Sequence, residues 1–294
     1  MIRHSHSVWS FVLLGLVLWL AIGVVPARAQ QPSQEPVQPP PAEPGQPASQ
    51  QDDASLRPVE PDFVVINLPT TMPLPVHGSD FHLTHRFNLD LTSVSFSEAA
   101  SNLFGLDNGA FIGLEYRFGV VRHLQAIVLR TQIQKTFQFS AKYDGWRQGE
   151  RLPIGISAIV SVEGQDNFKR DYSPALGLVL SRDIRDRVAL YATPFWVHNT
   201  DIDASPTRDT GFIGVGGRLR FLEATYVSAE VTPRIGGYVP SGSYAAYGFA
   251  IEQRVGGHHF SLTFTGGAAT TYAQLALGGT KGVFLGFNLS RKFF

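Results

Sequence analysis

A set of ionisable side chains recurs at alternate positions in extended stretches of the 294-residue sequence, and these side chains are its first candidates for chemistry. Because successive side chains of a strand point to opposite faces, residues at alternate positions share one face. If those faces surround a common interior, cations outnumber anions there, which would favour an anionic solute. The candidate lumen-lining residues are Arg86, Glu115, Arg117, Lys142, Arg218, Arg220, Glu230, Glu252, Arg254 and Lys292.

The same charges have a structural interpretation that stays open. A charge buried in a narrow barrel requires a partner whether or not a solute passes. Glu230 would face Arg218 or Arg220 on one neighbouring strand. Arg254 would face the same carboxylate from the other neighbouring strand. A barrel filled by mutually paired charges is therefore the alternative to a polar passage.

Groups for nucleophilic catalysis are present, but the sequence does not place them together. A nucleophile and its base must meet within hydrogen-bond reach, and no characteristic motif surrounds a serine in this sequence. We therefore predict that the protein is not an enzyme, and a membrane-barrel hydrolase acting on lipids is the alternative. The residues that such a hydrolase could use are His198, His259, Ser261, Ser290 and Asp107.

Metal, cofactor and nucleic-acid sites are not expected. His258 and His259 are adjacent in an expected strand, so they point to opposite faces, and His82 and His85 also differ in parity. The sequence has no cysteine, which excludes disulfides and thiolate ligands. Its 24 basic and 24 acidic residues leave no cationic excess for binding phosphates. We predict no metal, no cofactor and no nucleic-acid partner.

The N-terminal part of the chain differs in composition from the rest. Residues 1–29 combine Arg3, an apolar run at 8–25 and an Ala-Arg-Ala sequence at 27–29, which predicts a signal peptide. An uncleaved membrane anchor is the alternative. Residues 30–62 are rich in proline and glutamine, which predicts a disordered periplasmic tether that acts as a spacer.

Residues 63–294 have a strand pattern almost throughout and predict a single all-β domain. Alternation with a period of two marks about twelve strands, and short helical turns are expected only at 97–104 and 268–277. The expected strands are 80–89, 109–118, 124–132, 135–143, 152–163, 173–182, 187–198, 211–221, 225–233, 245–255, 258–265 and 282–293.

The connections between these strands indicate a transmembrane barrel. Long and short connections nearly alternate along the chain, as expected when short periplasmic turns face longer outer loops. One pair breaks the rule, because the connection near 132–134 is short and the one at 144–151 is longer than expected. The pattern predicts an antiparallel up-and-down barrel.

The C-terminal stretch illustrates how the two faces of a strand differ and which of them we expect to meet lipid. Val283, Leu285, Phe287, Leu289 and Phe293 alternate with Gly286, Asn288, Ser290 and Lys292. Such polar faces carry too few charges for a surface exposed to water, so we expect the apolar faces to lie outward. A soluble barrel with its apolar face inward is the alternative. Phe293 and Phe294 are the candidate assembly signal, although the apolar register runs through Phe293.

Four stretches are similar to those of a bacterial family of presumed outer-membrane β-barrel proteins of unknown function. They are LPTTMPLP (68–75), FGLDNGAFIGLEYRFG (104–119), KTFQFSAKYD (135–144) and GFNLSRKF (286–293). The resemblance covers most of the chain after about residue 63. It implies a barrel and an envelope location, and it implies no activity.

The most economical hypothesis is a bacterial outer-membrane β-barrel that acts as a small passive channel or lumen-binding protein for an unidentified solute. Its expected partners are the lipid bilayer and the outer-membrane assembly machinery, with a further periplasmic contact through the tether. A barrel enzyme and a structural or partner-docking barrel are the other classes.

Overall fold

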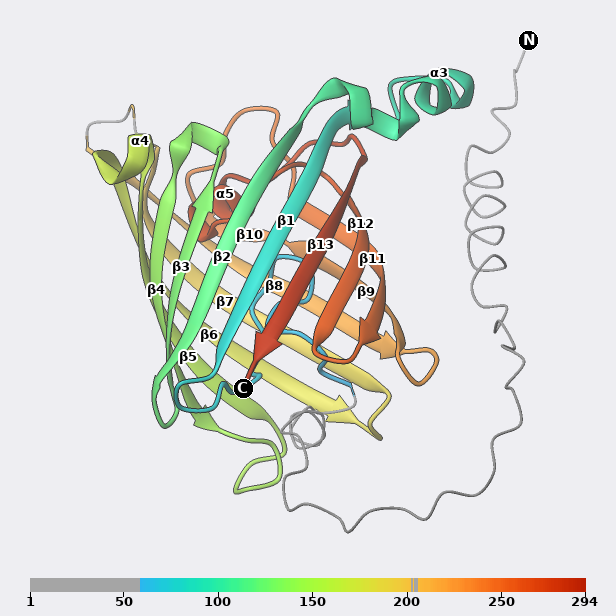
Figure 1. The fold of residues 1–294 in the computed structure, drawn as a ribbon. Coiled ribbons are helices and arrows are strands. Elements are labelled where there is room, and N and C mark those ends of the chain that lie inside the picture. The colour runs from blue at the N-terminus through green and yellow to red at the C-terminus, as the bar shows by residue number, and fades with distance from the viewer. Residues whose placement is uncertain (1–58, 202, 204–205) are drawn as a thin grey trace, which may run out of the picture. The chain divides into compact units, whose positions relative to one another are not determined.

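The computed structural model describes residues 59–201, 203 and 206–294, and within these residues the strands form a closed antiparallel barrel (Figure 1). The predicted signal peptide and residues 30–58 of the predicted tether lie outside the described residues. Within the described range, no helix is both long and apolar enough to cross a membrane.

Every strand expected from period-two alternation is present, with its ends within a few residues of the expected bounds. The strands are β1 Ser79–Asp90, β2 Ala110–Val121, β3 Leu124–Thr131, β4 Phe137–Trp146, β5 Gly155–Gly164, β6 Arg170–Ile184, β7 Val188–Asp201, β8 Arg208–Arg220, β9 Thr225–Thr232, β10 Arg234–Gly237, β11 Ala246–Val255, β12 His258–Thr265 and β13 Phe284–Phe293.

Each strand pairs with its neighbours in the sequence, and the first strand pairs with the last. The sheet contains thirteen strands, and β10 is a short continuation of β9, so twelve strands form the wall. Pro233 separates β9 from β10 because proline has no N–H to donate to the ladder. The ring closes through the β1–β13 pair, in which Ser79 lies opposite Phe293. The predicted up-and-down barrel is confirmed.

Short helices occupy the connections. The expected helical turns at 97–104 and 268–277 are present, whereas those at Gln165–Phe168 and Ile133–Lys135 were not expected. The helices are α3 Phe96–Ser101, η1 Leu103–Asn108, η2 Ile133–Lys135, α4 Gln165–Phe168 and α5 Tyr272–Leu277.

The two ends of the barrel differ in the length of their connections. At the short-turn end, β1 begins, β13 ends, and tight turns such as those at 122–123 and 256–257 join neighbouring strands. The long-loop end carries the connections at 91–109 and 266–283. The break in the alternation is real, because β3 and β4 are joined at the long-loop end by only the short connection that contains η2.

Polar side chains point inward and apolar side chains point outward, as predicted. On β13, Asn288, Ser290 and Lys292 are buried, whereas Phe287 and Phe293 are exposed. The outward faces are too apolar for water, and this arrangement suits a wall surrounded by lipid. The soluble alternative, with the apolar faces inside, is wrong.

The two C-terminal residues lie on different sides of the wall. Phe293 is exposed on the outside, where the Arg291 guanidinium lies over its ring. Phe294 packs against a buried cluster of Phe63, Met72 and Leu74. The last residue of the chain is therefore part of an interior contact and does not continue the outward row.

We expect the cost of an arginine on the outer face to depend on depth. Leu178 lies near the middle of the 15-residue strand β6 and is 44% exposed, and Ile184 ends that strand and is 40% exposed. Leu178→Arg should lower the free energy of unfolding by about 2–4 kcal/mol, and Ile184→Arg by about 0–1 kcal/mol. Urea unfolding in lipid vesicles measures both, and equal losses would contradict the assigned membrane position.

Candidate functional site

A segment that precedes the first strand enters the barrel from the short-turn end and occupies its lumen (Figure 1). We call residues 59–75 the plug. Its centre is a hairpin in which the amide of Thr70 donates to the carbonyl of Phe63 at 2.9 Å. The amide of Val65 donates to the carbonyl of Leu68 at 2.8 Å and closes the tip. The plug precedes the first expected strand in the sequence, and in the structure it is folded inside the barrel.

The boundary predicted between tether and barrel at residue 62 therefore moves toward the N-terminus. Val59, Glu60, Pro61 and Asp62 are all buried and belong to the plug. The physical reason is the apolar run at 63–68, which needs an interior and draws the preceding residues in with it.

The plug fills a space that the wall cannot fill by itself. A barrel of about eight strands is just wide enough for its own side chains to fill, and a twelve-stranded wall encloses more. Ile66 and Leu68 of the plug join a buried apolar cluster with Phe195 and Phe212 of the wall. Apolar packing therefore seats one side of the plug tip against strands β7 and β8.

The backbone of the tip is held by a single carboxylate. The oxygens of Glu230 accept hydrogen bonds from the amides of Ile66, Asn67 and Leu68 at 3.0 to 3.1 Å. The side-chain amide of Asn67 donates to the same carboxylate at 2.9 Å. Several N–H groups directed at one ionised acceptor form a strong, charge-assisted contact.

This arrangement corrects the expectation that Glu230 pairs with arginines of the neighbouring strands. Arg218 pairs with Glu252 instead, at 2.7 Å, and both side chains are fully buried. Arg220 and Arg254 are partly exposed, and the Arg220 Nε donates to the carbonyl of Glu223. In the register Glu230 lies opposite Gly216 and Gly248, so Arg220 and Arg254 are four and six positions away along their strands, and the carboxylate binds the plug instead.

Lysines of the wall bind backbone carbonyls of the plug near the short-turn end. Lys142 Nζ donates to the carbonyl of Met72 at 2.8 Å. Lys292 Nζ donates to the carbonyl of Pro61 at 2.5 Å. These two contacts hold the two arms of the hairpin from β4 and β13, which lie four strands apart around the wall.

Three buried arginines also contact the plug. The Nη2 atom of Arg218 donates to the carbonyl of Val64 at 2.8 Å. The Nη2 atom of Arg86 donates to Asn67 Oδ1 at 3.3 Å. The guanidinium of Arg117 lies 4.9 Å from the centre of the Phe63 ring. Among the sequence candidates, every fully buried cation therefore touches the plug.

The expected excess of cations is not present among the described buried residues of the inner face. Three further acids, Asp80, Asp144 and Glu163, are buried there besides Glu230 and Glu252. The cations of the wall have nearby acids in several cases, for example Lys142 Nζ and Asp144 Oδ1 at 2.8 Å. Glu115 likewise lies 2.7 Å from Arg117. The interior is mixed in charge.

Asp62 of the plug is the centre of a second polar cluster near the short-turn end. Its Oδ2 lies 3.1 Å from His259 Nδ1 and 3.6 Å from His82 Nδ1. Ser290 donates to its other oxygen at 3.0 Å, and Lys292 Nζ lies 3.8 Å from that oxygen. Burial alone would raise the pKa of the Asp62 carboxyl, but the charges of His259 and Lys292 outweigh burial and hold the pKa well below its ordinary value.

The groups proposed for a hydrolase are not arranged as a nucleophile and base. Ser290 and His259 are cross-strand partners, but both side chains contact Asp62, and the serine donates to this carboxylate. His198 Nδ1 lies 2.7 Å from Asp209 Oδ1 in a partly exposed pair. Asp107 is exposed in η1. The described residues give no serine whose hydroxyl is directed at an imidazole.

The connection between β12 and β13 folds inward from the long-loop end and narrows the rest of the lumen (Figure 1). Its helix α5 begins at a capping box formed by Thr271 and Gln274. The amide of Tyr272 donates to Gln138 at 3.0 Å, and the amide of Ala273 donates to Glu163 at 3.2 Å. Wall side chains thus accept hydrogen bonds from the free N–H groups at the start of the helix. Glu230 does the same for the amides of the plug tip.

Two small cavities among the described residues border the plug. One cavity of about 20 Å³ adjoins His82 and Glu115, and another of about 10 Å³ adjoins Asn67 and Ala246. A cavity of about 10–15 Å³ holds one water molecule. Each of these two cavities is therefore about the size of a single water molecule and is too small for a solute.

The plug itself was missed by sequence reasoning, although a signal was present. The stretch FVVINLPTTMPLP at 63–75 is apolar and contains three prolines, yet it lies between the tether and the first expected strand. An apolar run that does not alternate with polar residues is not typical of a barrel strand, and it needs burial in an interior formed by other elements. Asp80, Asp144 and Glu163 were missed because they lie at or just beyond the ends of expected strands.

Comparison with known families gives one match over nearly the whole described chain. The model of a family described as a membrane bound beta barrel domain (DUF5777) matches residues 62–293. No curated protein matches the chain.

Two solved porins are similar in outline. A KdgM porin has 8% sequence identity and a TM-score of 0.49, covering 74% of this chain and 99% of the porin. A mutant porin of Rh. blastica has 13% identity and a TM-score of 0.34, covering 66% of this chain and 58% of the porin. Scores this low carry no inference about this chain.

Loss of the Glu230 charge should loosen the plug while the wall stays closed. Glu230→Gln keeps the side-chain volume but replaces one acceptor oxygen by a donor that faces the plug amides. Because a hydrogen bond to a charged group contributes about 1.5–3 kcal/mol, thermolysin cleavage within 63–74 should become on the order of 30-fold faster. Barrel closure is checked by heat-dependent migration in detergent gels.

Glu223→Gln, in the exposed turn between β8 and β9, is the matched control and should leave cleavage unchanged. Equal cleavage of wild type and Glu230→Gln would show that the carboxylate does not hold the tip.

Proposed function

The chain belongs to the family of membrane-bound β-barrel domains, and on that premise we propose that it is a passive channel of the bacterial outer membrane whose lumen is closed by the plug. The outward apolar faces support a position in lipid, and the division into short turns and long loops supports an outer-membrane orientation. In this orientation the short-turn end and the plug face the periplasm.

The observation that carries the proposal is that a separate hairpin fills the lumen. A wall designed only as a scaffold could close on its own side chains with fewer strands. Here the twelve-stranded wall leaves space, and the plug occupies it through contacts to wall side chains. Withdrawal of the plug would expose a lumen lined by the polar groups that now bind it.

The geometry of the hairpin permits such a withdrawal. Asp62 contacts His82 near the start of β1, and residues 61–62 bind Ser290 and Lys292 near the end of β13. Beyond the other arm, the amide of His77 donates to the carbonyl of Gly119 at 2.8 Å. Both arms therefore leave at the short-turn end, so the tip can move out without threading a chain end through the barrel. A periplasmic partner that binds the predicted tether could favour this movement.

The expected solute is small and polar, with weak preference for charge sign. Arg218 and Glu252 are paired within the wall, as are Lys142 and Asp144, and these pairs would remain after the plug has left. The buried acids Asp80, Asp144 and Glu163 offset the cations that suggested an anionic solute. We therefore expect the open channel to discriminate only weakly between anionic and cationic solutes.

A channel is favoured over an enzyme by the arrangement of the interior. At Asp62 the hydroxyl of Ser290 donates to the carboxylate, and Lys292 lies 3.8 Å from the same oxygen, so this serine is bound to an acid and not to a base. An outer-membrane hydrolase requires a nucleophile that meets both a base and the lipid. The buried position of Ser290 and His259 beneath the plug does not provide that access.

A disulfide between plug and wall tests the proposal. Thr71 Oγ1 and Ser181 Oγ lie 2.6 Å apart, on the plug and on β6, and the chain has no native cysteine. In Thr71→Cys/Ser181→Cys we expect channel openings in planar bilayers while the protein is reduced. After oxidation the openings should stop, because the cross-link holds the plug in place, and reductant should restore them.

The two single-cysteine variants, treated with the same oxidant, should conduct as the reduced double variant does. Conductance of the fully oxidised double variant would show that passage does not depend on the plug. Absence of openings from the wild type and from the reduced variant at all voltages would contradict a channel.

A further inference from the structure

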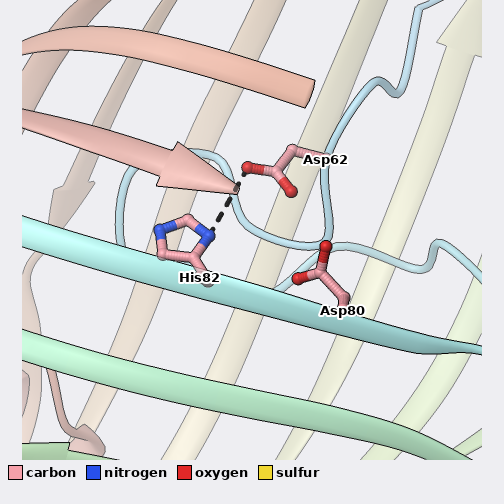
Figure 2. A group of neighbouring side chains, drawn as sticks. All are labelled: Asp62, Asp80 and His82. Carbon is pink, nitrogen blue, oxygen red and sulfur yellow. Dashed lines mark ion pairs between the residues drawn. The ribbon is translucent and has the colours of Figure 1, made fainter. Parts of the chain in front are cut away.

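We propose that Asp62, Asp80 and His82 form a binding site for one divalent transition-metal cation, best suited to Zn²⁺, which joins the plug to strand β1 (Figure 2). One ligand atom from each residue lies within 4.8 Å of the ligand atoms of the other two. The site combines residues from two elements, so a bound ion would connect the movable plug to the wall.

The positions of the three residues follow from the strand and the hairpin. Asp80 and His82 are two positions apart on β1, so both side chains point into the lumen. Asp62 approaches them from the plug, and Figure 2 shows its carboxylate facing the imidazole of His82 and the carboxylate of Asp80. Both β1 residues are anchored in a wall strand that pairs on both sides.

Unpartnered atoms provide an independent indication of a ligand. Asp80 is 1% exposed, and neither of its carboxylate oxygens has a hydrogen-bond partner. His82 is 3% exposed, and neither of its ring nitrogens has a hydrogen-bond partner, since its Nδ1 lies 3.6 Å from Asp62 Oδ2. Buried polar atoms normally have partners, because leaving one unsatisfied costs about 1–3 kcal/mol. A cation between Asp62, Asp80 and His82 would satisfy both side chains at once.

Neighbouring cations do not already fill this role. Lys292 and Arg117 lie opposite Asp80 in the register of the two adjacent strands. Lys292 is directed at the plug, where it binds the carbonyl of Pro61, and Arg117 is paired with Glu115. The carboxylate of Asp80 is therefore left facing the space in front of Asp62.

The surroundings also supply what a metal site needs beyond its ligands. His259 lies 3.1 Å from Asp62 Oδ2, while its Nε2 lies 3.2 Å from Glu252, so a carboxylate orients the imidazole that positions Asp62. A tetrahedral ion with three protein ligands takes a water molecule as its fourth ligand.

The ligand types favour Zn²⁺ among the common divalent cations. Two carboxylates neutralise the charge of the ion, and an imidazole nitrogen is a ligand that Zn²⁺ accepts at about 2.0–2.1 Å. Ca²⁺ and Mg²⁺ prefer sites made entirely of oxygen atoms. Competition with Mn²⁺, Ca²⁺ and Mg²⁺ tests this order, and weaker binding of all three is the expected result.

Binding of the ion does not depend on the proposed channel, but its effect on the plug does. Because the site spans the plug and β1, Zn²⁺ should slow cleavage of the plug by thermolysin, and a chelator should accelerate it. Failure of the conductance experiment would leave the metal site intact, since metal content is measured directly. Failure of the metal experiment would likewise leave the conductance result unchanged.

The test uses the full chain without a histidine tag, stripped with chelator and dialysed against Zn²⁺ in detergent. We expect roughly one tightly bound ion per wild-type barrel by mass spectrometry of metal content. Asp80→Asn and His82→Gln should each weaken Zn²⁺ binding by at least about a hundredfold, because each removes a ligand. His85→Gln changes the same residue type on the outward face of the same strand, and it should bind as the wild type does.

Heat-dependent migration in gels confirms that each variant has a closed barrel before its metal content is compared. If Asp80→Asn does not assemble, His82→Gln alone decides the question. Wild-type protein without stoichiometric Zn²⁺, or variants that bind it as well as His85→Gln does, would overturn the proposal.

Discussion

The hydrogen bonds between the Glu230 carboxylate and the amides of the plug tip are the contact on which the closed lumen depends. The strands of a closed barrel satisfy one another, so the wall offers few backbone acceptors to a chain that enters its lumen. A hairpin tip with three free N–H groups in such an interior needs an acceptor from a side chain. Glu230 supplies one, and the carbonyls of the plug are satisfied in turn by Lys142, Lys292 and Arg218.

This division of donors and acceptors explains why charged residues occur inside the barrel. A buried charge is costly unless it is paired and hydrogen-bonded, and here the plug completes the coordination of each buried cation among the candidates. The proposed withdrawal of the plug would require water to replace these carbonyl and amide partners in the hydrated lumen. The apolar cluster around Ile66 and Leu68 opposes that exchange and favours the closed state.

The wall of the barrel could be predicted from the sequence, but the segments that fill its lumen could not. Strand positions, strand number and face assignment could be predicted because each strand alternates between lipid and interior, as β13 does from Gly286 to Phe293. The plug could not be predicted, because its apolar run has no alternation of apolar and polar residues that would show which surface it packs against. The partner of Glu230 depends on a contact between residues 66–68 and a strand more than 160 positions later in the chain. Asp62 was assigned to the tether, so its meeting with Asp80 and His82 was not foreseeable either.

Amide hydrogen exchange at Ile66, Asn67 and Leu68 of the wild-type protein in detergent tests the central claim most directly. With Glu230 as acceptor and the tip buried in the lumen, these amides should exchange slowly, at rates approaching those of the wall strands. Exchange as fast as in an unstructured peptide, with the strands still protected, would contradict the account, because the plug would then not occupy the lumen.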